Sequence, residues 1–125
     1  MIFNAVDRRR VPFCALEYRL RDNAALSSID QNVIVLMLRP RNRPLQILVD
    51  PNWRDMVQLT DRAYIGEILA DFKQRALSDP EALFVQVKSL AVGPLVTHSE
   101  GTRVAEHPGL LERVGTFIEL SVPLN

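Results

Sequence analysis

Residues 33–38 read Val-Ile-Val-Leu-Met-Leu, a run in which every side chain is apolar. Successive side chains of a strand point to opposite faces of its sheet, so an unbroken apolar run must be covered on both faces. The β-branched start and the short length favour a strand over a helix. The run therefore predicts a strand near the centre of a sheet.

Two further strands are predicted on either side of this run in the chain. Apolar and polar residues alternate over 11–21, with Cys14, Leu16, Tyr18 and Leu20 on one face. This alternation predicts a half-buried strand. Residues 45–49 predict a strand that returns from the central one after the segment 39–44, in which two prolines interrupt the chain. We therefore expect a hairpin with a stiff, basic tip.

Three helix starts are marked by proline, which suits the first helical position because its missing N–H would be unpaired there. They are Asp50-Pro51, Asp79-Pro80 and His107-Pro108. Asp79 is the expected N-cap of the second, and Gly115 is expected to end the third in a left-handed conformation. The longest helix is predicted over 61–77, because its apolar residues recur on one face. That stripe consists of Ile65, Ile68, Leu69, Phe72 and Ala76.

The remaining pattern completes the expected fold. A helix over 80–90 has Leu83, Phe84, Val87 and Leu90 on its apolar side. A short strand at 95–97, a turn at 99–101 and a return at 102–104 suggest a small hairpin, and 116–122 suggest a last strand with Ile118, Leu120 and Val122 on one face. We predict one α+β domain over 1–125, with a mainly antiparallel sheet of four to six strands packed against a helical pair.

Bulk composition excludes several classes of protein. The chain has 125 residues, of which 47% are hydrophobic and 24% charged, as in ordinary globular domains. A single cysteine excludes an internal disulfide and a cysteine-based zinc site. No apolar run reaches membrane-spanning length, and basic residues follow the first apolar residues, the reverse of a secretory signal. We expect a cytoplasmic protein without a membrane partner.

The leading functional hypothesis is a non-catalytic protein-interaction domain that self-associates, most simply as a homodimer. The sequence has no phosphate-binding Gly-rich loop, no dinucleotide fingerprint and no Gly-x-Ser-x-Gly. We expect no cofactor and no bound metal. Residues 1–45 carry eight arginines and four acidic residues, whereas residues 46–125 carry seven basic and eleven acidic residues. Such asymmetry suits head-to-tail self-association or an anionic partner, and it is equally expected where two oppositely charged halves meet within the folded domain.

The first alternative is an anionic-ligand or RNA-binding domain. Arg39, Arg41 and Arg43 alternate along the hairpin tip, and guanidinium groups bind phosphate and carboxylate. Arg8–Arg10 and Arg19/Arg21 are candidates to join them on one side of the sheet. The alternative is a soluble loop whose arginines guard a sheet edge against pairing. Single-strand binders also need stacking aromatic residues, which the tip lacks, so nucleic acid is less favoured than a protein partner. Trp53 is a candidate interface residue, and equally a candidate apolar anchor of a short helix.

The second alternative is a small enzyme with a His/Glu site in the segment 98–107. His98, Glu100 and His107 are weak catalytic candidates, with Glu106 beside them, because histidine and carboxylate are the usual general acids and bases. His98 and His107 would approach each other across the expected hairpin. Cys14 lies among apolar strand residues and is expected to be a buried structural thiol.

Overall fold

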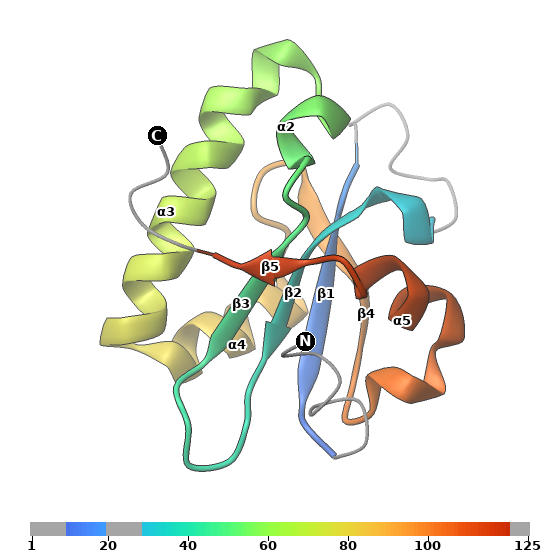
Figure 1. Ribbon diagram of the computed structural model, residues 1–125. Coiled ribbons are helices and arrows are strands. Elements are labelled where there is room, and N and C mark those ends of the chain that lie inside the picture. Colours follow the sequence, from blue (N-terminus) through green and yellow to red (C-terminus); the bar gives the residue numbers. More distant parts are fainter. Residues whose placement is uncertain (1–9, 20–28, 121–125) are drawn as a thin grey trace.

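The computed structural model describes residues 10–19 and 29–120, which form a five-stranded antiparallel sheet with helices on both faces (Figure 1). The strand order is β4-β1-β2-β3-β5, and all neighbouring strands are antiparallel. The strands are β1 Phe13–Tyr18, β2 Val33–Leu38, β3 Gln46–Val49, β4 Leu95–Gly101 and β5 Ile118–Glu119. The predicted α+β class, the antiparallel sheet and the 33–49 hairpin are confirmed.

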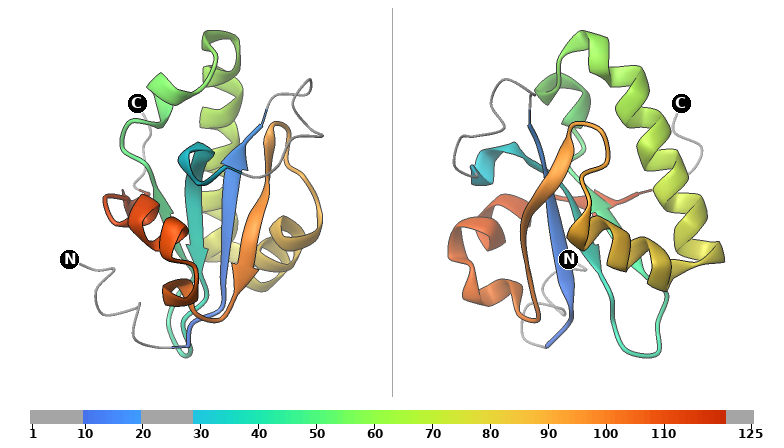
Figure 2. Two further views of the ribbon diagram at one scale, coloured as in Figure 1. Left: turned by 90° about the vertical axis from the view of Figure 1, so that its right-hand side faces the viewer. Right: turned by 180° about the vertical axis from the view of Figure 1, so that it is seen from behind.

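The helices form two layers, one on each face of the sheet. They are α2 Trp53–Met56, α3 Arg62–Ser78, α4 Pro80–Ser89 and α5 Pro108–Val114, with short 3-10 turns η2 Asp30–Asn32, η3 Leu59–Asp61 and η4 Val104–Glu106. Figure 2 shows α4 and α5 on opposite sides of the sheet. The helical pair α3 and α4 confirms the prediction. Within residues 10–19 and 29–120, no helix has the length and apolar character needed to cross a membrane.

Two hydrophobic cores follow from these layers. The larger lies under α3 and α4, and it contains every residue of the predicted α3 stripe as well as Cys14 and Leu16 of β1. The smaller lies under α5, where it contains Phe13 and Ala15 from the opposite face of β1. All six residues of β2 are buried, as its apolar run predicts, because each core covers one of its faces.

Strand β1 differs from the prediction of a half-buried strand. All six of its residues are buried, because the layer that contains α5 covers its second face. Glu17, on that face, is only 1% exposed. Its carboxylate accepts from Arg19 at 2.5 Å and from the backbone N–H of Ile29 at 3.4 Å. The alternation of polar and apolar residues therefore gave a wrong prediction of exposure, because the polar residue Glu17 is buried and paired.

The predicted small hairpin over 95–104 is wrong. Strand β4 continues for seven residues to Gly101 and pairs with β1 along its length, while Val104–Glu106 form a 3-10 turn. Ser99-Glu100-Gly101 have the composition of a turn, but the long-range hydrogen bonds with β1 determine their conformation. Helix α5 then begins at Pro108, as predicted.

Three expected helix ends also need correction. Pro51 precedes α2 rather than opening it, because the helix begins at Trp53. Leu90 lies beyond α4 in extended conformation and is 60% exposed, so it does not belong to the apolar side of that helix. Gly115 is right-handed, with φ of −61°. The predicted N-cap of α4 is confirmed, since Asp79 accepts from the backbone N–H of Ala82 at 3.3 Å.

The last strand is shorter than predicted, and Ile118 and Leu120, which were predicted on one face, differ in burial. Strand β5 contains only Ile118 and Glu119, which pair with β3 at the edge of the sheet. Ile118 is 53% exposed, whereas Phe117 and Leu120 are buried, one in each core. Predicted strand residues 121–122 lie outside the described residues.

Candidate functional site

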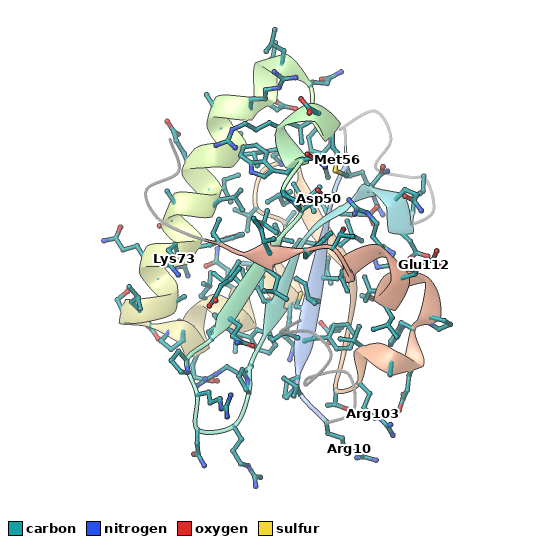
Figure 3. All side chains as sticks on the ribbon, viewed as in Figure 1. Arg10, Asp50, Met56, Lys73, Arg103 and Glu112 are labelled. Atoms are coloured by element: carbon teal, nitrogen blue, oxygen red, sulfur yellow. The ribbon has the colours of Figure 1, made fainter. Side chains whose placement is uncertain are left out.

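Three chain segments that carry arginine meet at one end of the sheet. The backbone N–H of Arg39 donates to Pro12 at 2.8 Å, and that of Val11 donates to Thr102 at 2.7 Å. These bonds bring the start of β1, the β2–β3 tip and the end of β4 side by side. Figure 3 shows Arg10 and Arg103 at this end of the molecule. We call the group the basic end, which consists of Arg10, Arg39, Arg41, Arg43 and Arg103.

The five guanidinium groups of the basic end differ in their partners. Arg39 pairs with Glu81 and also donates to the backbone carbonyl of Arg43 at 3.2 Å. Arg103 lies 3.7 Å from Glu106. The exposed side chains of Arg10, Arg41 and Arg43 form no ion pair with any described residue. Three cations are therefore free to bind an external anion.

The tip itself is held in a defined shape. Pro40 and Pro44 flank it and restrict their backbone angles. Between them Asn42 adopts φ of +60°, a left-handed conformation that asparagine tolerates better than most residues. The bond from Arg39 to the carbonyl of Arg43 closes the loop. Arg41 and Arg43 are therefore presented from a constrained turn, which lowers the entropy cost of binding.

A second group of polar residues surrounds a β-bulge at the middle of β4. Ala15 pairs with Ser99 while its neighbour Leu16 pairs with Thr97, so His98 is an extra residue without a partner on β1. Thr97 points to α4, where its hydroxyl donates to the backbone carbonyl of Val87 at 2.7 Å. Beyond this extra residue, each side chain of β4 points to the opposite face of the sheet from the one it would take in a regular strand. Bulges are known to redirect side chains in this way.

His98 links a serine to a carboxylate. Its Nδ1 lies 2.9 Å from Ser99 Oγ, and its Nε2 lies 2.8 Å from Asp30 Oδ1 in η2. The side chain of His98 is only 10% exposed, whereas that of Asp30 is 44% exposed. We refer to these three residues as the Asp30–His98–Ser99 array. Their atoms can pass a proton between hydroxyl and imidazole, which is the basis of general base catalysis.

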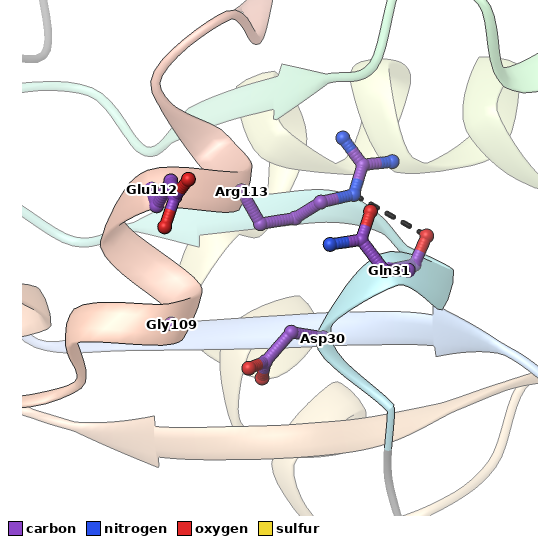
Figure 4. Close-up of a pocket in the computed structure, with 5 residues that line it drawn as sticks. All are labelled: Asp30, Gln31, Gly109, Glu112 and Arg113. Atoms are coloured by element: carbon purple, nitrogen blue, oxygen red, sulfur yellow. Dashed lines mark hydrogen bonds between the residues drawn. The ribbon is translucent and has the colours of Figure 1, made fainter.

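Asp30 also borders a pocket of ≈ 370 Å³ between η2 and α5. Its lining is Asp30, Gln31, Gly109, Glu112 and Arg113, and Figure 4 shows them on facing elements. Asp30 packs so closely on Gly109 that a Cβ there would lie 2.2 Å from Asp30 Oδ2. Glycine at this position therefore lets the carboxylate reach His98.

The charge of Arg113 in this pocket is already neutralised. Its guanidinium lies 2.5 Å from Asp50, and both side chains are nearly buried, at 10% and 9% exposure. It also donates to the carbonyl of Gln31 at 3.3 Å and stacks over Phe117 at 5.0 Å. Asp30 and Glu112 then leave the pocket with an acidic balance, which disfavours anionic ligands there.

The other residues predicted at 98–107 have different surroundings. Glu100 lies opposite Cys14 on the α4 side of the sheet, and His107 stacks edge-on against Phe13 at 5.5 Å. The structure therefore gives His98 the partners Asp30 and Ser99 instead of Glu100, Glu106 or His107. In the described part of the chain, no three His, Cys, Asp or Glu side chains are grouped to hold a metal ion.

Trp53 and Cys14 are both core residues. Trp53 is 3% exposed and lies in the larger core, with Arg54 stacked over its ring at 4.7 Å. Cys14 is fully buried, and burial raises the pKa of its thiol to about 12. A thiol with so high a pKa stays neutral and is a poor nucleophile. Neither residue belongs to the basic end or to the Asp30–His98–Ser99 array.

Sequence reasoning found part of each site and missed the rest. It identified the arginines of the tip and proposed that Arg8–Arg10 and Arg19/Arg21 join them. Arg10 does lie at that end, but Arg19 follows the opposite end of β1 and pairs with Glu17. Arg8, Arg9 and Arg21 are outside the described residues. It singled out His98 but overlooked Asp30 and Ser99. Ser99 follows His98 directly, and neighbours in a regular strand point to opposite faces, so only a predicted bulge would have signalled the pair.

Comparison with models of known protein families found no match, and comparison with curated proteins and with solved structures found no significant match.

Proposed function

We propose that this protein binds a phosphate-rich polyanion, in the form of RNA, through its basic end. The observation that carries the proposal is that adjacent segments at one end of the sheet carry Arg10, Arg41 and Arg43, three exposed arginines without an acidic partner among the described residues. Guanidinium groups bind phosphate in bidentate geometry and keep their charge at all physiological pH values. The constrained tip adds pre-organisation to this charge.

The chemistry of the basic end favours contacts to the phosphate backbone over contacts to bases. Base stacking requires exposed aromatic rings, and Phe13, the aromatic residue at the start of β1, is fully buried. Binding through phosphates alone does not depend on the base sequence of the RNA, and its affinity falls as the salt concentration rises. We therefore expect weak, sequence-independent binding whose affinity depends strongly on ionic strength.

The direct test is the affinity for a fluorescently labelled single-stranded RNA, measured by anisotropy over a series of salt concentrations. Three phosphate contacts predict a slope of about −2 in log K against log[salt], or roughly a 20-fold loss of affinity between 50 and 200 mM. The variant R10A/R41A/R43A should abolish most of that dependence. An unchanged affinity and slope in this variant would rule out the basic end as the binding surface.

A matched control removes three positive charges elsewhere. Arg54, Lys73 and Lys88 lie on α2, α3 and α4, outside the three segments that form the basic end. The variant R54A/K73A/K88A has the same net charge as R10A/R41A/R43A but should retain most of the affinity. An equal loss in both variants would show that binding follows net charge rather than a site.

A second candidate function is self-association into a homodimer through β4. Strand β4 is the longest strand and lies at the edge of the sheet, where it pairs with β1 on one side. On its other side, within the described residues, only Val92 forms a bridge, at Leu95. Unpaired backbone groups on a long edge strand are a template for another strand, including that of a second copy.

Sedimentation over a wide range of protein concentration tests this second proposal. A reversible monomer–dimer equilibrium is expected, and Val96→Lys should weaken it because charge on an edge strand opposes pairing. Val96→Thr is the control, since it keeps a β-branched residue without adding charge. A monomer at every concentration would exclude self-association, whereas a dimer insensitive to Val96→Lys would place the interface elsewhere.

A further inference from the structure

We propose that Ser99 is a nucleophilic serine, activated by His98 as general base, that accepts acyl groups from uncharged or cationic esters. The proposal concerns a different part of the molecule from the basic end and does not depend on polyanion binding. The hydrogen bonds of the neutral His98 ring indicate which of its nitrogens carries the proton. An ionised carboxylate only accepts hydrogen bonds, so the 2.8 Å contact with Asp30 places a proton on Nε2.

In the neutral ring, a proton on Nε2 leaves Nδ1 as an acceptor. That atom lies 2.9 Å from Ser99 Oγ, so the hydroxyl donates to it. This is the arrangement that a general base needs in order to remove the serine proton. Asp30 acts as a positioning residue, which holds the tautomer and stabilises the imidazolium once it forms.

The β-bulge explains why two consecutive residues can cooperate. In a regular strand His98 and Ser99 would point to opposite faces of the sheet. The extra residue between the pairs Leu16–Thr97 and Ala15–Ser99 brings both side chains within hydrogen-bond distance. Bulges are frequent beside active sites for this reason.

The proposed step is an ordinary acyl transfer. Ser99 Oγ attacks the carbonyl carbon of an ester while its proton passes to His98 Nδ1. The C–O bond to the leaving alcohol then breaks, and His98 returns the proton to that alcohol. Water, deprotonated by His98, then attacks the acyl carbon, the C–O bond to Ser99 Oγ breaks, and His98 returns the proton to Oγ, which leaves a carboxylic acid and the free Ser99 hydroxyl.

Access and charge define the class of substrate. Ser99 is partly exposed and lies on the edge strand β4, where backbone N–H groups that face away from β1 would stabilise a developing oxyanion. Asp30, whose carboxylate bonds to His98, also lines the pocket between η2 and α5 together with Glu112, and the charge of Arg113 in that pocket is neutralised by Asp50. These charges favour neutral or positively charged esters over anionic ones.

A fluorophosphonate probe tests the nucleophile directly, because Oγ attack on phosphorus releases fluoride and leaves a stable adduct. Mass spectrometry of the wild-type protein should locate one adduct on Ser99, and prior unfolding in urea should prevent it. His98→Gln should slow labelling by about 10²–10⁴-fold, the usual contribution of a general base. Asp30→Asn should also slow it, since an amide can donate to Nε2 and move the ring proton to Nδ1.

Ser89→Ala is the matched control, because Ser89 is an exposed serine that bonds only to backbone carbonyls of its own helix α4. It should label at the wild-type rate, and circular dichroism should show native folding in each variant. An adduct on another serine, or equal labelling rates in wild-type and folded His98→Gln protein, would overturn the proposal. Equal labelling of native and urea-unfolded wild-type protein would overturn it without any variant.

Discussion

The buried ion pair between Asp50 and Arg113 allows a quantitative prediction about stability. The two side chains are 2.5 Å apart and nearly buried, and Arg113 also contacts Gln31, Met56 and Phe117. Arg113→Ala would leave the Asp50 carboxylate buried without a counter-ion. Removing one partner of a buried pair costs about 3–5 kcal/mol, a large share of the 5–15 kcal/mol that stabilises a typical domain.

Urea unfolding, followed by circular dichroism, should measure this loss as a lower midpoint at constant m-value. The same change corresponds to a fall in Tm of about 10–20 °C for a chain of this length. Arg103→Ala is the matched control, because it removes a 3.7 Å contact with Glu106 between side chains that are 41% and 65% exposed, and surface pairs contribute about 0–1 kcal/mol. The double variant D50N/R113M should recover part of the loss, since it leaves no buried charge. A loss below about 1 kcal/mol in Arg113→Ala would refute this reasoning.

Three other substitutions test features of the fold. Gly109→Ala should displace the Asp30 carboxylate, which a Cβ would approach to 2.2 Å, so fluorophosphonate labelling of Ser99 should slow even where urea unfolding shows a small loss of stability. Gly93→Ala should lower the free energy of unfolding by roughly 1–3 kcal/mol in the same urea assay, because Gly93 has φ of +59° and a tyrosine ring packs on it. Burial raises the pKa of Cys14 from 9.0 to about 12, so the free energy of unfolding should decline as pH rises from about 9 towards 12. Cys14→Ala should lack that part of the decline when urea midpoints are compared across this pH range.

The parts of the fold that were predicted from sequence depend on local pattern. The unbroken apolar run of β2 and the helical period of the α3 stripe each lie within one segment, so neither prediction needs knowledge of distant residues. The end of β4 could not be predicted in this way. Ser99-Glu100-Gly101 have the composition of a turn, and only pairing with β1, more than eighty residues earlier in the chain, makes them a strand.

The two candidate sites differ in the same way, because one lies largely within a single segment and the other is assembled from distant segments. The arginines of the tip are visible in the sequence because they alternate within one short segment. The Asp30–His98–Ser99 array depends on a bulge in one strand and on a turn almost seventy residues away, and neither has a local signature. A group of residues that lie far apart in the sequence therefore could not be predicted from local sequence pattern.

Strand β4 takes part in two of the proposals, and they make opposite demands on it. Pairing with a second copy would occupy the outward N–H groups that the acyl transfer at Ser99 needs as oxyanion donors. If β4 forms the dimer interface, fluorophosphonate labelling per chain should fall as protein concentration rises through the dimerisation range. Val96→Lys should restore labelling at high concentration, whereas R10A/R41A/R43A should not. Labelling that is independent of concentration in a chain that sediments as a dimer would show that the two copies meet on another surface.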